Sequence, residues 1–394
     1  MAKLKHALRH YDFLLAFTTV VLSVFGVVMI YASIHADAVP GFITERWQWL
    51  YERQLLYVVS GVVLMFVVSA VDYRWFTRFY IYIYGLMLAL LFVVMFVGAS
   101  EPGVSRWLWI PLPVFGALSM QPSEFSKLFM ILFLAKFLDV SRDRFNRPIW
   151  LLFIMVLIAV PVGMVAIQPS FSASMVILSV SLVILFVGGL YYRTILVGSI
   201  MLTPIGIMIW LDMQRTEQLF ITRILADWQW QRIATMLDPI PGSDAFRQTE
   251  GSLFAIGSGG LTGRGFMNNS YVILGHNDFI FSVVAEQFGF IGASLLLAVV
   301  ALMIIRCVRI ALRAQDLEGR LIAAGVAGML MFETFFHVGV VTNLLPNTGV
   351  PFPFMSYGGS MIWVHMIAMG IVLNIGIPRT KYMFDDDEEV EVLL

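Results

Sequence analysis

The chain has 394 residues, of which 59% are hydrophobic and 13% are charged, and its formal net charge at pH 7 is -1. A soluble domain is less apolar and more charged, so the mean hydropathy of +0.85 excludes an ordinary soluble protein and indicates an integral membrane protein. The nearly neutral charge argues against nucleic acid as a partner, because a surface that follows a phosphate backbone needs concentrated Lys and Arg. The single cysteine, Cys307, excludes an intramolecular disulfide and a cysteine-based zinc cluster, and an inert thiol is expected there.

The N-terminus has the charge pattern of a secretory signal, with Lys3, Lys5 and Arg9 before an apolar run. That run, from Phe13 to Ile34, is about as long as a full membrane span of roughly 20 residues and longer than the core of a signal peptide. It is therefore expected to be a retained first helix.

Apolar runs of similar length recur along the chain, and each can cross about 30 Å of hydrocarbon at about 1.5 Å per residue. They predict an all-α polytopic membrane protein, with about ten transmembrane helices in a single domain over 1-394 and a long outer loop between the seventh and eighth. The expected spans lie near 13-34, 54-72, 79-98, 123-140, 149-167, 171-191, 194-213, 278-305, 321-342 and 357-377.

An even number of spans puts both termini on one side of the membrane. The short connections on that side carry most of the Lys and Arg residues, so both termini are expected to be cytoplasmic. The segments 1-12 and 378-394 are then cytoplasmic. The second contains the acidic run Asp385–Glu391, whose single sign of charge is typical of a disordered tail.

The outer connection over about 99-122 contains Pro111 and Pro113, which predict a short irregular loop. Its Arg106-Trp107-Leu108-Trp109 sequence is typical of an aromatic anchor at the membrane interface.

Glu124 and Lys127 follow this connection, one helical turn apart, and their side chains share a helix face on which they can pair. Ionisable residues in a span tend to face a cavity or a partner, which makes the pair a functional candidate. An interfacial pair that reaches the headgroups would give the same pattern.

The outer segment 214-277 is too long to be a simple connection. Apolar residues recur at helical spacing from Ile221 to Leu237 and predict an amphipathic helix that lies in the interface. Arg223 and Arg232 in this helix are candidates to contact a lipid phosphate, although a helix that only lies beside headgroups would look the same.

Glycine-rich turns fill the part of this segment from Gln248 to Gly265. Backbone amides in such turns can cradle an anion, but the spacing fits neither the P-loop nor the dinucleotide fingerprint. A sharp loop that dips towards the membrane is expected instead of a nucleotide site.

Asp278 lies where the segment, after His276 and Asn277, enters an apolar helix. A carboxylate at such an edge is partly desolvated, which raises its pKa and suits it to accept a proton from a hydroxyl. The alternative is that Asp278 only caps the helix and complements its dipole.

The last outer connection, Leu345 to Ser360, is too rich in proline and glycine to be helical. Irregular backbone at membrane depth is tolerated only where protein buries it or where it lines a cavity. This connection is therefore expected to form one wall of a cavity.

Three motifs stand in order along the chain: Gln121-Pro122-Ser123-Glu124 with Lys127, His276-Asn277-Asp278-Phe279-Ile280-Phe281 with Glu286 and Gly289, and Pro351-Phe352-Pro353-Phe354-Met355-Ser356-Tyr357-Gly358-Gly359-Ser360. In these motifs and their order, nearly the whole chain resembles the SEDS family of bacterial cell-wall proteins (RodA, FtsW and SpoVE).

The resemblance implies a ten-helix enzyme of the plasma membrane that polymerises lipid II, a disaccharide peptide on undecaprenyl pyrophosphate, into glycan strands. It also implies a class B penicillin-binding protein as the transpeptidase partner. The family's essential aspartate falls on Asp278. The residues expected to bind substrate are Arg53, Arg106, Glu124, Lys127, Arg232, Gln248, His276, Ser356, Tyr357, Gly358 and Gly359.

The chain departs from the family pattern at several positions. Ser170 stands where members often have an aspartate, so one cavity carboxylate is absent, and His337 replaces a common asparagine. Ile273-Leu274 and Glu286-Gln287 replace the usual Pro-Glu and Glu-Glu.

Glycan polymerisation needs a base for the acceptor hydroxyl and positive charge for the leaving diphosphate. Asp278 is the expected base, and Arg106, Lys127 and Arg232 are the expected phosphate partners. A divalent cation could assist the diphosphate, although no ligand cluster in the sequence requires one.

A competing hypothesis is a lipid II flippase, a transporter without chemistry. A flippase needs polar groups along the path from the inner side, where Lys136 and Glu333 are the few candidates.

Overall fold

The computed structural model describes residues 9–35, 49–97, 106–112, 116–168, 170–194, 196, 203–204, 227–240, 243, 246–268, 275 and 277–378. Within these residues the chain is an all-helical polytopic membrane protein with one small hairpin. Six of the described helices are long and apolar enough to cross a membrane: α2 (Phe13–Ile34), α4 (Leu50–Ala70), α6 (Tyr80–Val97), α8 (Pro148–Ile167), α14 (Ile280–Arg313) and α15 (Leu317–Val341).

Three further helices belong to the same bundle: the shorter apolar helices α9 (Phe171–Val187) and α16 (Gly359–Ile375), and α7 (Pro122–Val140), which has charged residues near both of its ends. The six long helices and these three lie at the expected positions, with bounds that differ from expectation by up to four residues, except that α14 ends at Arg313, eight residues beyond the expected 305. The span expected at 194-213 falls almost entirely outside the described residues.

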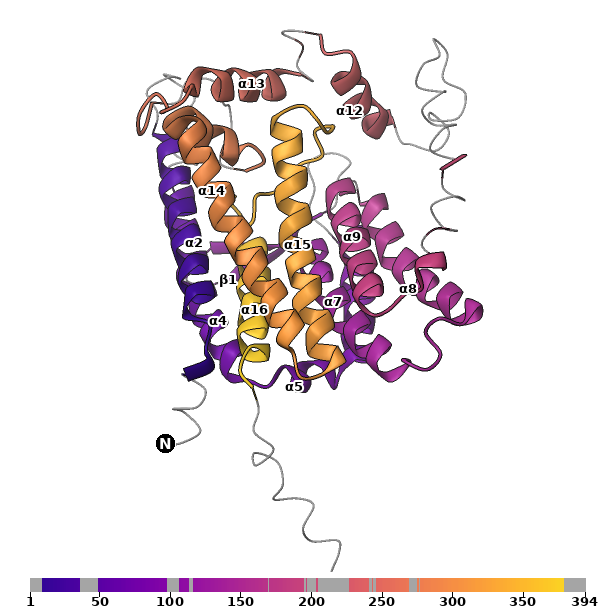
Figure 1. The fold of residues 1–394 in the computed structure, drawn as a ribbon. Helices are drawn as coiled ribbons and strands as arrows, with labels where there is room; N and C mark the ends of the chain where they lie inside the picture. Colours follow the sequence, from indigo (N-terminus) through magenta and orange to yellow (C-terminus); the bar gives the residue numbers. More distant parts are fainter. Residues whose placement is uncertain are drawn as a thin grey trace, which may run out of the picture.

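The helices pack side by side, with α16 along α4, α15 between α14 and α9, and α7 against α6 and α9 (Figure 1). The short helix α5 (Tyr73–Thr77) lies at one end of the bundle, below in Figure 1, which we call the α5 end. The helices α12 (Asp227–Leu237) and α13 (Arg247–Gly259) lie at the other end, which we call the α13 end.

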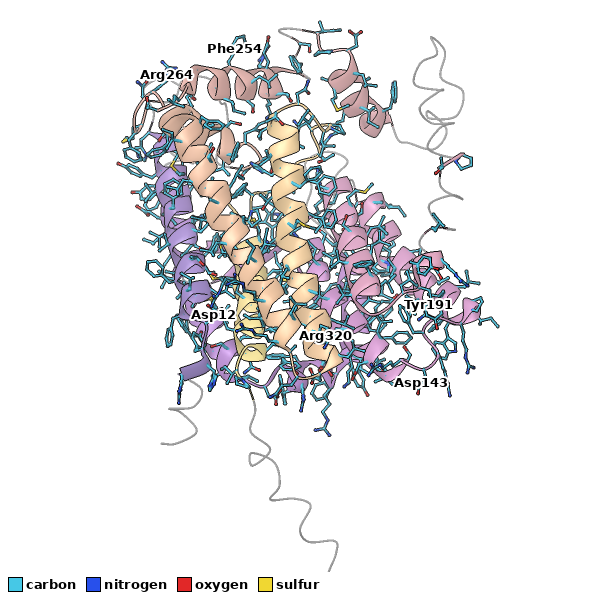
Figure 2. The ribbon with its side chains drawn as sticks, viewed as in Figure 1. Asp12, Asp143, Tyr191, Phe254, Arg264 and Arg320 are labelled. Carbon is cyan, nitrogen blue, oxygen red and sulfur yellow. The ribbon has the colours of Figure 1, made fainter. Side chains whose placement is uncertain are left out.

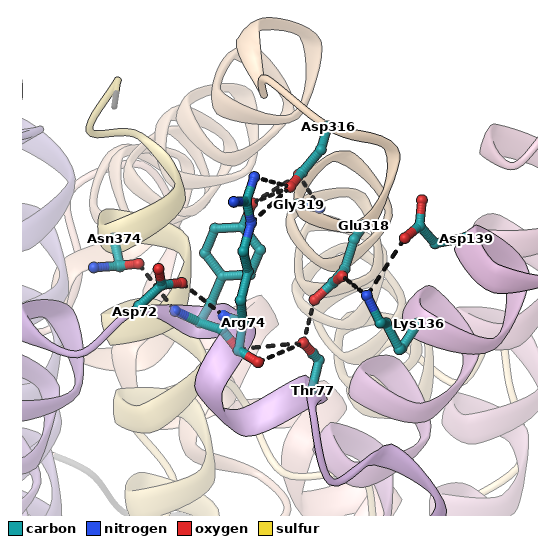
Figure 3. A network of polar contacts seen from close by, with 10 residues as sticks. Asp72, Arg74, Thr77, Lys136, Asp139, Asp316, Glu318, Gly319 and Asn374 are labelled. Atoms are coloured by element: carbon teal, nitrogen blue, oxygen red, sulfur yellow. Dashed lines mark hydrogen bonds and ion pairs between the residues drawn. The ribbon is translucent and has the colours of Figure 1, made fainter. Parts of the chain in front are cut away.

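Polar side chains fasten the α5 end (Figure 3). Asp316 accepts hydrogen bonds from Tyr73 at 2.7 Å and from Arg74 at 2.7 Å, and its carboxylate also caps α15 by accepting from the amide of Gly319. Lys136 of α7 pairs with the buried Glu318 at 2.6 Å. These contacts tie α5, α7 and α15 together.

The helix α14 is broken at Gly289, where φ is 66° and ψ is -164°. The turn at 260–265 inserts its backbone into the break, so that the amides of Arg264 and Gly265 donate to the carbonyls of Glu286 and Gln287 at 2.9 and 3.1 Å. In the other direction, the amides of Phe290 and Ile291 donate to the carbonyls of Gly260 and Leu261 at 2.9 and 3.1 Å. The turn thus replaces hydrogen bonds that the helix loses.

Side chains reinforce this junction. Arg264 pairs with the buried Glu286 at 3.1 Å, and Figure 2 shows Arg264 at the α13 end. Ser252 of α13 donates to the carbonyl of Val341 at 2.7 Å and lies 2.6 Å from the Ser282 hydroxyl, which joins α13 to α14 and α15.

Two expectations for the outer connections were wrong. The segment over 99-122 was expected to be irregular, but β1 (Leu108–Leu112) and β2 (Gly116–Met120) form an antiparallel hairpin in which Pro111 faces Ala117. A proline is tolerated in a two-stranded sheet because each strand is an edge.

The segment from Gln248 was expected to be a loop, but most of it is the helix α13, and only the residues after Gly259 turn. The glycine-rich amides there are not open to an anion, because those of Gly263, Arg264 and Gly265 already donate to backbone carbonyls. The expected amphipathic helix is described only as α12, and Ile221 and Arg223 lie outside the described residues.

Candidate functional site

A cavity of about 420 Å³ opens at the α13 end of the bundle. Its walls come from the β1–β2 hairpin, α4, α7, α9, α12, α15, the residues before α14 and the connection before α16. The last of these confirms the expectation that the connection from Leu345 to Ser360 forms one wall of a cavity. The residues that line it include Tyr57, Arg106, Trp107, Trp109, Ser119, Gln121, Glu124, Lys127, Ser170, Ser172, Arg232, Asn277, Asp278, Glu333, Gly349, Tyr357, Gly358, Gly359 and Ser360.

Asp278 faces this cavity together with two arginines that come from distant parts of the chain, Arg106 before β1 and Arg232 on α12. Burial raises the pKa of Asp278 above its usual range, although the charges of Arg232 and Arg106 oppose that rise. The same burial lowers the pKa of Arg106, against the charge of Asp278. Asp278 is therefore a partly desolvated carboxylate that shares the cavity with two guanidinium groups, and such a group can accept a proton.

Asp278 does not cap the helix that follows it. The N-cap of α14 is Phe279, whose side chain makes no capping hydrogen bond, and Asp278 lies one residue earlier. The capping alternative for Asp278 is therefore wrong.

Hydrogen bonds hold the residue before Asp278 against the connection that precedes α16. The buried Ser356 hydroxyl donates to the carbonyl of Asn277 at 2.6 Å and accepts from the amide of Phe352 at 2.8 Å. Gln54 of α4 fixes the same connection, because its amide donates to the Ser356 carbonyl and accepts from the Gly358 amide, both at 3.1 Å.

His337 fixes the connection from α15. Its Nδ1 donates to the carbonyl of Val350 at 2.8 Å and its Nε2 accepts from the amide of Phe281 at 3.4 Å, which defines a neutral ring with the proton on Nδ1. His337 thus joins α14 to the cavity wall.

The deep wall of the cavity holds a row of buried ionisable groups. Lys127 pairs with Glu124 at 2.7 Å and with Glu333 at 2.5 Å, and the second carboxylate oxygen of Glu333 lies 2.5 Å from Nε2 of His365. Glu124 is 5% exposed and Lys127 is 1% exposed. The pair therefore faces the cavity, and the interfacial alternative is wrong.

Tyr357 and Tyr57 form an aromatic side of the cavity, with ring centroids 6.3 Å apart. Burial raises the pKa of Tyr357 to about 12, with the nearby Tyr57 adding to the rise and Arg53 opposing it. The Tyr357 phenol therefore stays protonated and can donate a hydrogen bond.

Of the residues expected to bind substrate, Arg106, Glu124, Lys127, Arg232, Tyr357, Gly358 and Gly359 line the cavity together with Asp278. Arg53 is exposed and does not line the cavity but interacts with Tyr357, which does, and Ser356 is buried behind the wall. Gln248 does not line the cavity, because it lies on an exposed side of α13. His276 lies outside the described residues.

Several site residues were missed in the sequence, and Glu333 was assigned to the wrong place. It was expected on a path from the inner side, but it lines the deep wall of the cavity. Gln54, Tyr57 and His365 were not identified, although Gln54 and His365 are polar residues inside apolar runs, which is a recognisable signal. Ser170, where the family resemblance led us to expect an aspartate, lines the wall of the cavity.

Among the residues that the structure describes, no group of three or more His, Cys, Asp or Glu side chains is placed to hold a metal ion.

Comparison with known proteins gives a consistent result. The family model FTSW_RODA_SPOVE, described as a cell cycle protein, matches residues 13–381. A probable peptidoglycan glycosyltransferase FtsW of Trichlorobacter lovleyi is 31% identical over 376 residues, which cover 93% of each chain. The peptidoglycan glycosyltransferase MrdB of Escherichia coli K12 is 34% identical over 338 residues, which cover 83% of this chain and 86% of MrdB.

Two solved structures share the fold. A chain of the complex described as "Structural coordination of polymerization and crosslinking by a peptidoglycan synthase complex" superposes with a TM-score of 0.75 at 28% identity, covering 94% of this chain and 99% of that one. The crystal structure of the rod shape determining protein RodA of Thermus thermophilus gives a TM-score of 0.64 at 28% identity, covering 93% of this chain and 96% of RodA.

Proposed function

The chain belongs to the FtsW/RodA/SpoVE (SEDS) family and is a peptidoglycan glycosyltransferase of the bacterial inner membrane, and we propose that the cavity at the α13 end is its active site, with Asp278 as the general base. The single observation that carries this proposal is that Asp278 lines the cavity together with two arginines whose charges act on it. Lipid II is the proposed substrate, and the growing glycan strand is the product.

The proposed reaction transfers one glycosyl group. The acceptor 4-hydroxyl loses its proton to Asp278 while its oxygen bonds to the anomeric carbon of the donor. The bond from that carbon to the lipid diphosphate breaks, and the diphosphate leaves with the electron pair. A base that is partly desolvated suits the first event, and fixed positive charge suits the last.

We assign the leaving diphosphate to Arg106 and Arg232. Both are beside Asp278, and each can donate two parallel hydrogen bonds to phosphate oxygens. Lys127 is a poorer partner than the sequence suggested, because its ammonium is already paired with Glu124 and Glu333. Its proposed role is to hold those two carboxylates in the deep wall.

The proposed orientation puts the α13 end outside the cell, both termini in the cytoplasm and ten spans across the membrane. The charge distribution of the sequence supports this orientation. The described helices cover every expected span except the one at 194-213.

A class B penicillin-binding protein is the proposed partner. The similarity to a chain of a peptidoglycan synthase complex that couples polymerisation to crosslinking supports it.

The flippase alternative is disfavoured by α7. Between Lys127 in the cavity wall and Lys136 at the α5 end, every residue of α7 is apolar, over about 13 Å at 1.5 Å per residue. The charged groups at the α5 end pair with one another, because Lys136 forms ion pairs with Glu318 and Asp139. A path for a polar headgroup along this helix would cross that apolar stretch.

The test is polymerisation of lipid II by the purified chain, with and without its penicillin-binding protein, with glycan products resolved on a gel. We expect strands from the wild type and none from Asp278→Asn, because asparagine is nearly isosteric but a poor base. Asp143→Asn is the matched control, since Asp143 is exposed at the α5 end (Figure 2) and should leave the product unchanged. An active Asp278→Asn enzyme would remove Asp278 from the chemistry.

A further inference from the structure

Four buried groups form one continuous chain across three helices: Glu124 and Lys127 of α7, Glu333 of α15 and His365 of α16. The successive contacts are 2.7 Å from Glu124 to Lys127, 2.5 Å from Lys127 to Glu333 and 2.5 Å from Glu333 to His365. The first three line the cavity, whereas His365 is 0% exposed and lies behind them. We call these residues the buried quartet.

The hydrogen bonds of His365 fix the number of protons in the buried quartet. Its Nδ1 lies 2.7 Å from the carbonyl of Met361, which can only accept, so Nδ1 carries a proton. In a neutral ring Nε2 would then be an acceptor facing Glu333 Oε2 at 2.5 Å. Two acceptors do not approach so closely, so one further proton lies between Nε2 and Oε2, whichever of the two groups it is assigned to.

That proton sets the charge of the buried quartet. With it, the quartet is neutral, because Glu124 and Lys127 cancel and the Glu333–His365 pair has no net charge. Without it, the quartet has one net negative charge. The other charged groups that line the cavity in the described residues are Arg106, Arg232 and Asp278, which together have one net positive charge. The cavity is therefore net positive only while the extra proton is present.

We propose that His365 is a positioning residue that keeps this proton in its contact with Glu333, and thereby keeps the cavity net positive for the diphosphate of the lipid substrate. His365 does not line the cavity and acts through Glu333, which in turn fixes Lys127. The identity of the anion rests on the proposed function, whereas the net charge of the cavity does not depend on it.

The experiment measures binding of undecaprenyl diphosphate to the purified full chain in detergent. His365→Gln keeps a donor for Glu333 but cannot carry the proton. One added negative charge at about 10 Å and an effective dielectric constant of about 20 should weaken binding by at least about tenfold, because the diphosphate has more than one negative charge. Undecaprenol, which has the same chain and no charge, is the matched ligand and should bind both proteins alike.

The double variant His365→Gln with Glu333→Gln separates charge from structure. The double variant has no negative charge at position 333, where His365→Gln alone leaves an ionised Glu333, and its two glutamine side chains can still hydrogen-bond. We therefore expect it to recover most of the lost affinity for the diphosphate. If His365 only supported the fold, the double variant would bind no better than His365→Gln. That result would overturn the proposal, as would unchanged diphosphate binding by a folded His365→Gln protein.

Glu333→Gln alone gives a test that does not depend on the folding of the histidine variant. If the wild-type quartet is neutral, Glu333→Gln binds the diphosphate no tighter than the wild type. If the quartet is already negative, removing that charge tightens binding by at least about tenfold and the proposal is wrong.

Because these are binding measurements, their outcome is independent of the polymerisation assay. Strands from the wild type together with charge-insensitive binding would retain the proposed function and reject the inference.

Discussion

Gly349 lies against the carboxylate of Asp278. A Cβ atom added to Gly349 would be 3.0 Å from Oδ2 of Asp278, and Gly349 has φ +70°, a conformation that favours glycine. The carbonyl of the same residue accepts a hydrogen bond from Ser172 at 3.4 Å. The connection before α16 therefore fixes the position of Asp278 through direct contact as well as through Ser356.

Gly349→Ala should lower the rate of lipid II polymerisation at least tenfold, because the new methyl group displaces the Asp278 carboxylate. Its backbone strain, about 1–2 kcal/mol, should leave the protein folded. Gly189→Ala is the matched control, since Gly189 has φ +94° but nothing within 4 Å of the added Cβ. Equal polymerisation rates for the two variants would show that the contact with Asp278 is unimportant.

The pH dependence of polymerisation should report the ionisation of Asp278. The base must be ionised, so the rate falls as pH drops through its pKa, which burial raises above the usual range of aspartate. Arg106→Gln removes a positive charge that favours the carboxylate, so the pKa should rise further and the acid limb of the pH–rate profile should move to higher pH.

Arg193→Gln is the control for that shift, because Arg193 is exposed and does not line the cavity. An acid limb that moves to lower pH, or does not move, in Arg106→Gln would contradict the assignment of Asp278 as the base.

Lys127→Met should destabilise the protein by about 3–5 kcal/mol, because it leaves the buried carboxylates of Glu124 and Glu333 without their cation. Arg74→Met is the comparison at the α5 end, where the Arg74 and Asp316 side chains are 47% and 26% exposed, and it should cost about 1 kcal/mol or less. The midpoint of thermal unfolding in detergent measures both. A Lys127→Met protein as stable as Arg74→Met would mean that the carboxylates find other partners or are protonated.

Gly289→Ala should separate the turn at 260–265 from α14. The added Cβ would lie 2.3 Å from the amide nitrogen of Gly263, which is backbone and cannot rotate away. We expect a lower unfolding midpoint and faster trypsin cleavage after Arg264. Gly163→Ala in α8 is the control, because its Cβ would meet nothing within 4 Å, and alanine in a helix should be neutral or stabilising. Unchanged cleavage after Arg264 would show that the junction tolerates a side chain.

The long helices could be predicted because each apolar run is as long as the hydrocarbon it crosses, and α2 matches its expected bounds of 13 and 34. The hairpin at the cavity could not, since Pro111 and Pro113 argue against a strand and only pairing with residues 116–120 outweighs them. The helix α13 was missed because its glycines predict turns, whereas Gly259 allows close packing: a Cβ there would lie 2.0 Å from the carbonyl oxygen of Ala285.

The candidate site was predictable where chemistry depends on a local motif, as at Asp278 and at Glu124 with Lys127. It was not predictable where distant segments meet, since Arg106 and Arg232 converge on Asp278 only through the fold. Glu333 could have been placed better, because α15 ends at Val341 and Glu333 is nearer to that end than to Leu317. Its position along α15 already indicates that it lies in the half of the helix nearer the α13 end, where the cavity opens.

The junction at Gly289 also makes the segment that carries Asp278 a closed loop. A backbone hydrogen bond joins the amide of Gly265 to the carbonyl of Gln287, so the two ends of the roughly 20-residue segment between them are held together, as a covalent crosslink would hold them. The conformational entropy that the chain loses when Asp278 takes its position therefore depends on the length of this closed segment and not on the length of the whole outer segment. A residue inserted between 266 and 276 would lengthen this segment without changing the spacing from Asp278 to α14 or its contact with Gly349, so the length of the outer segment can vary while the base keeps its place.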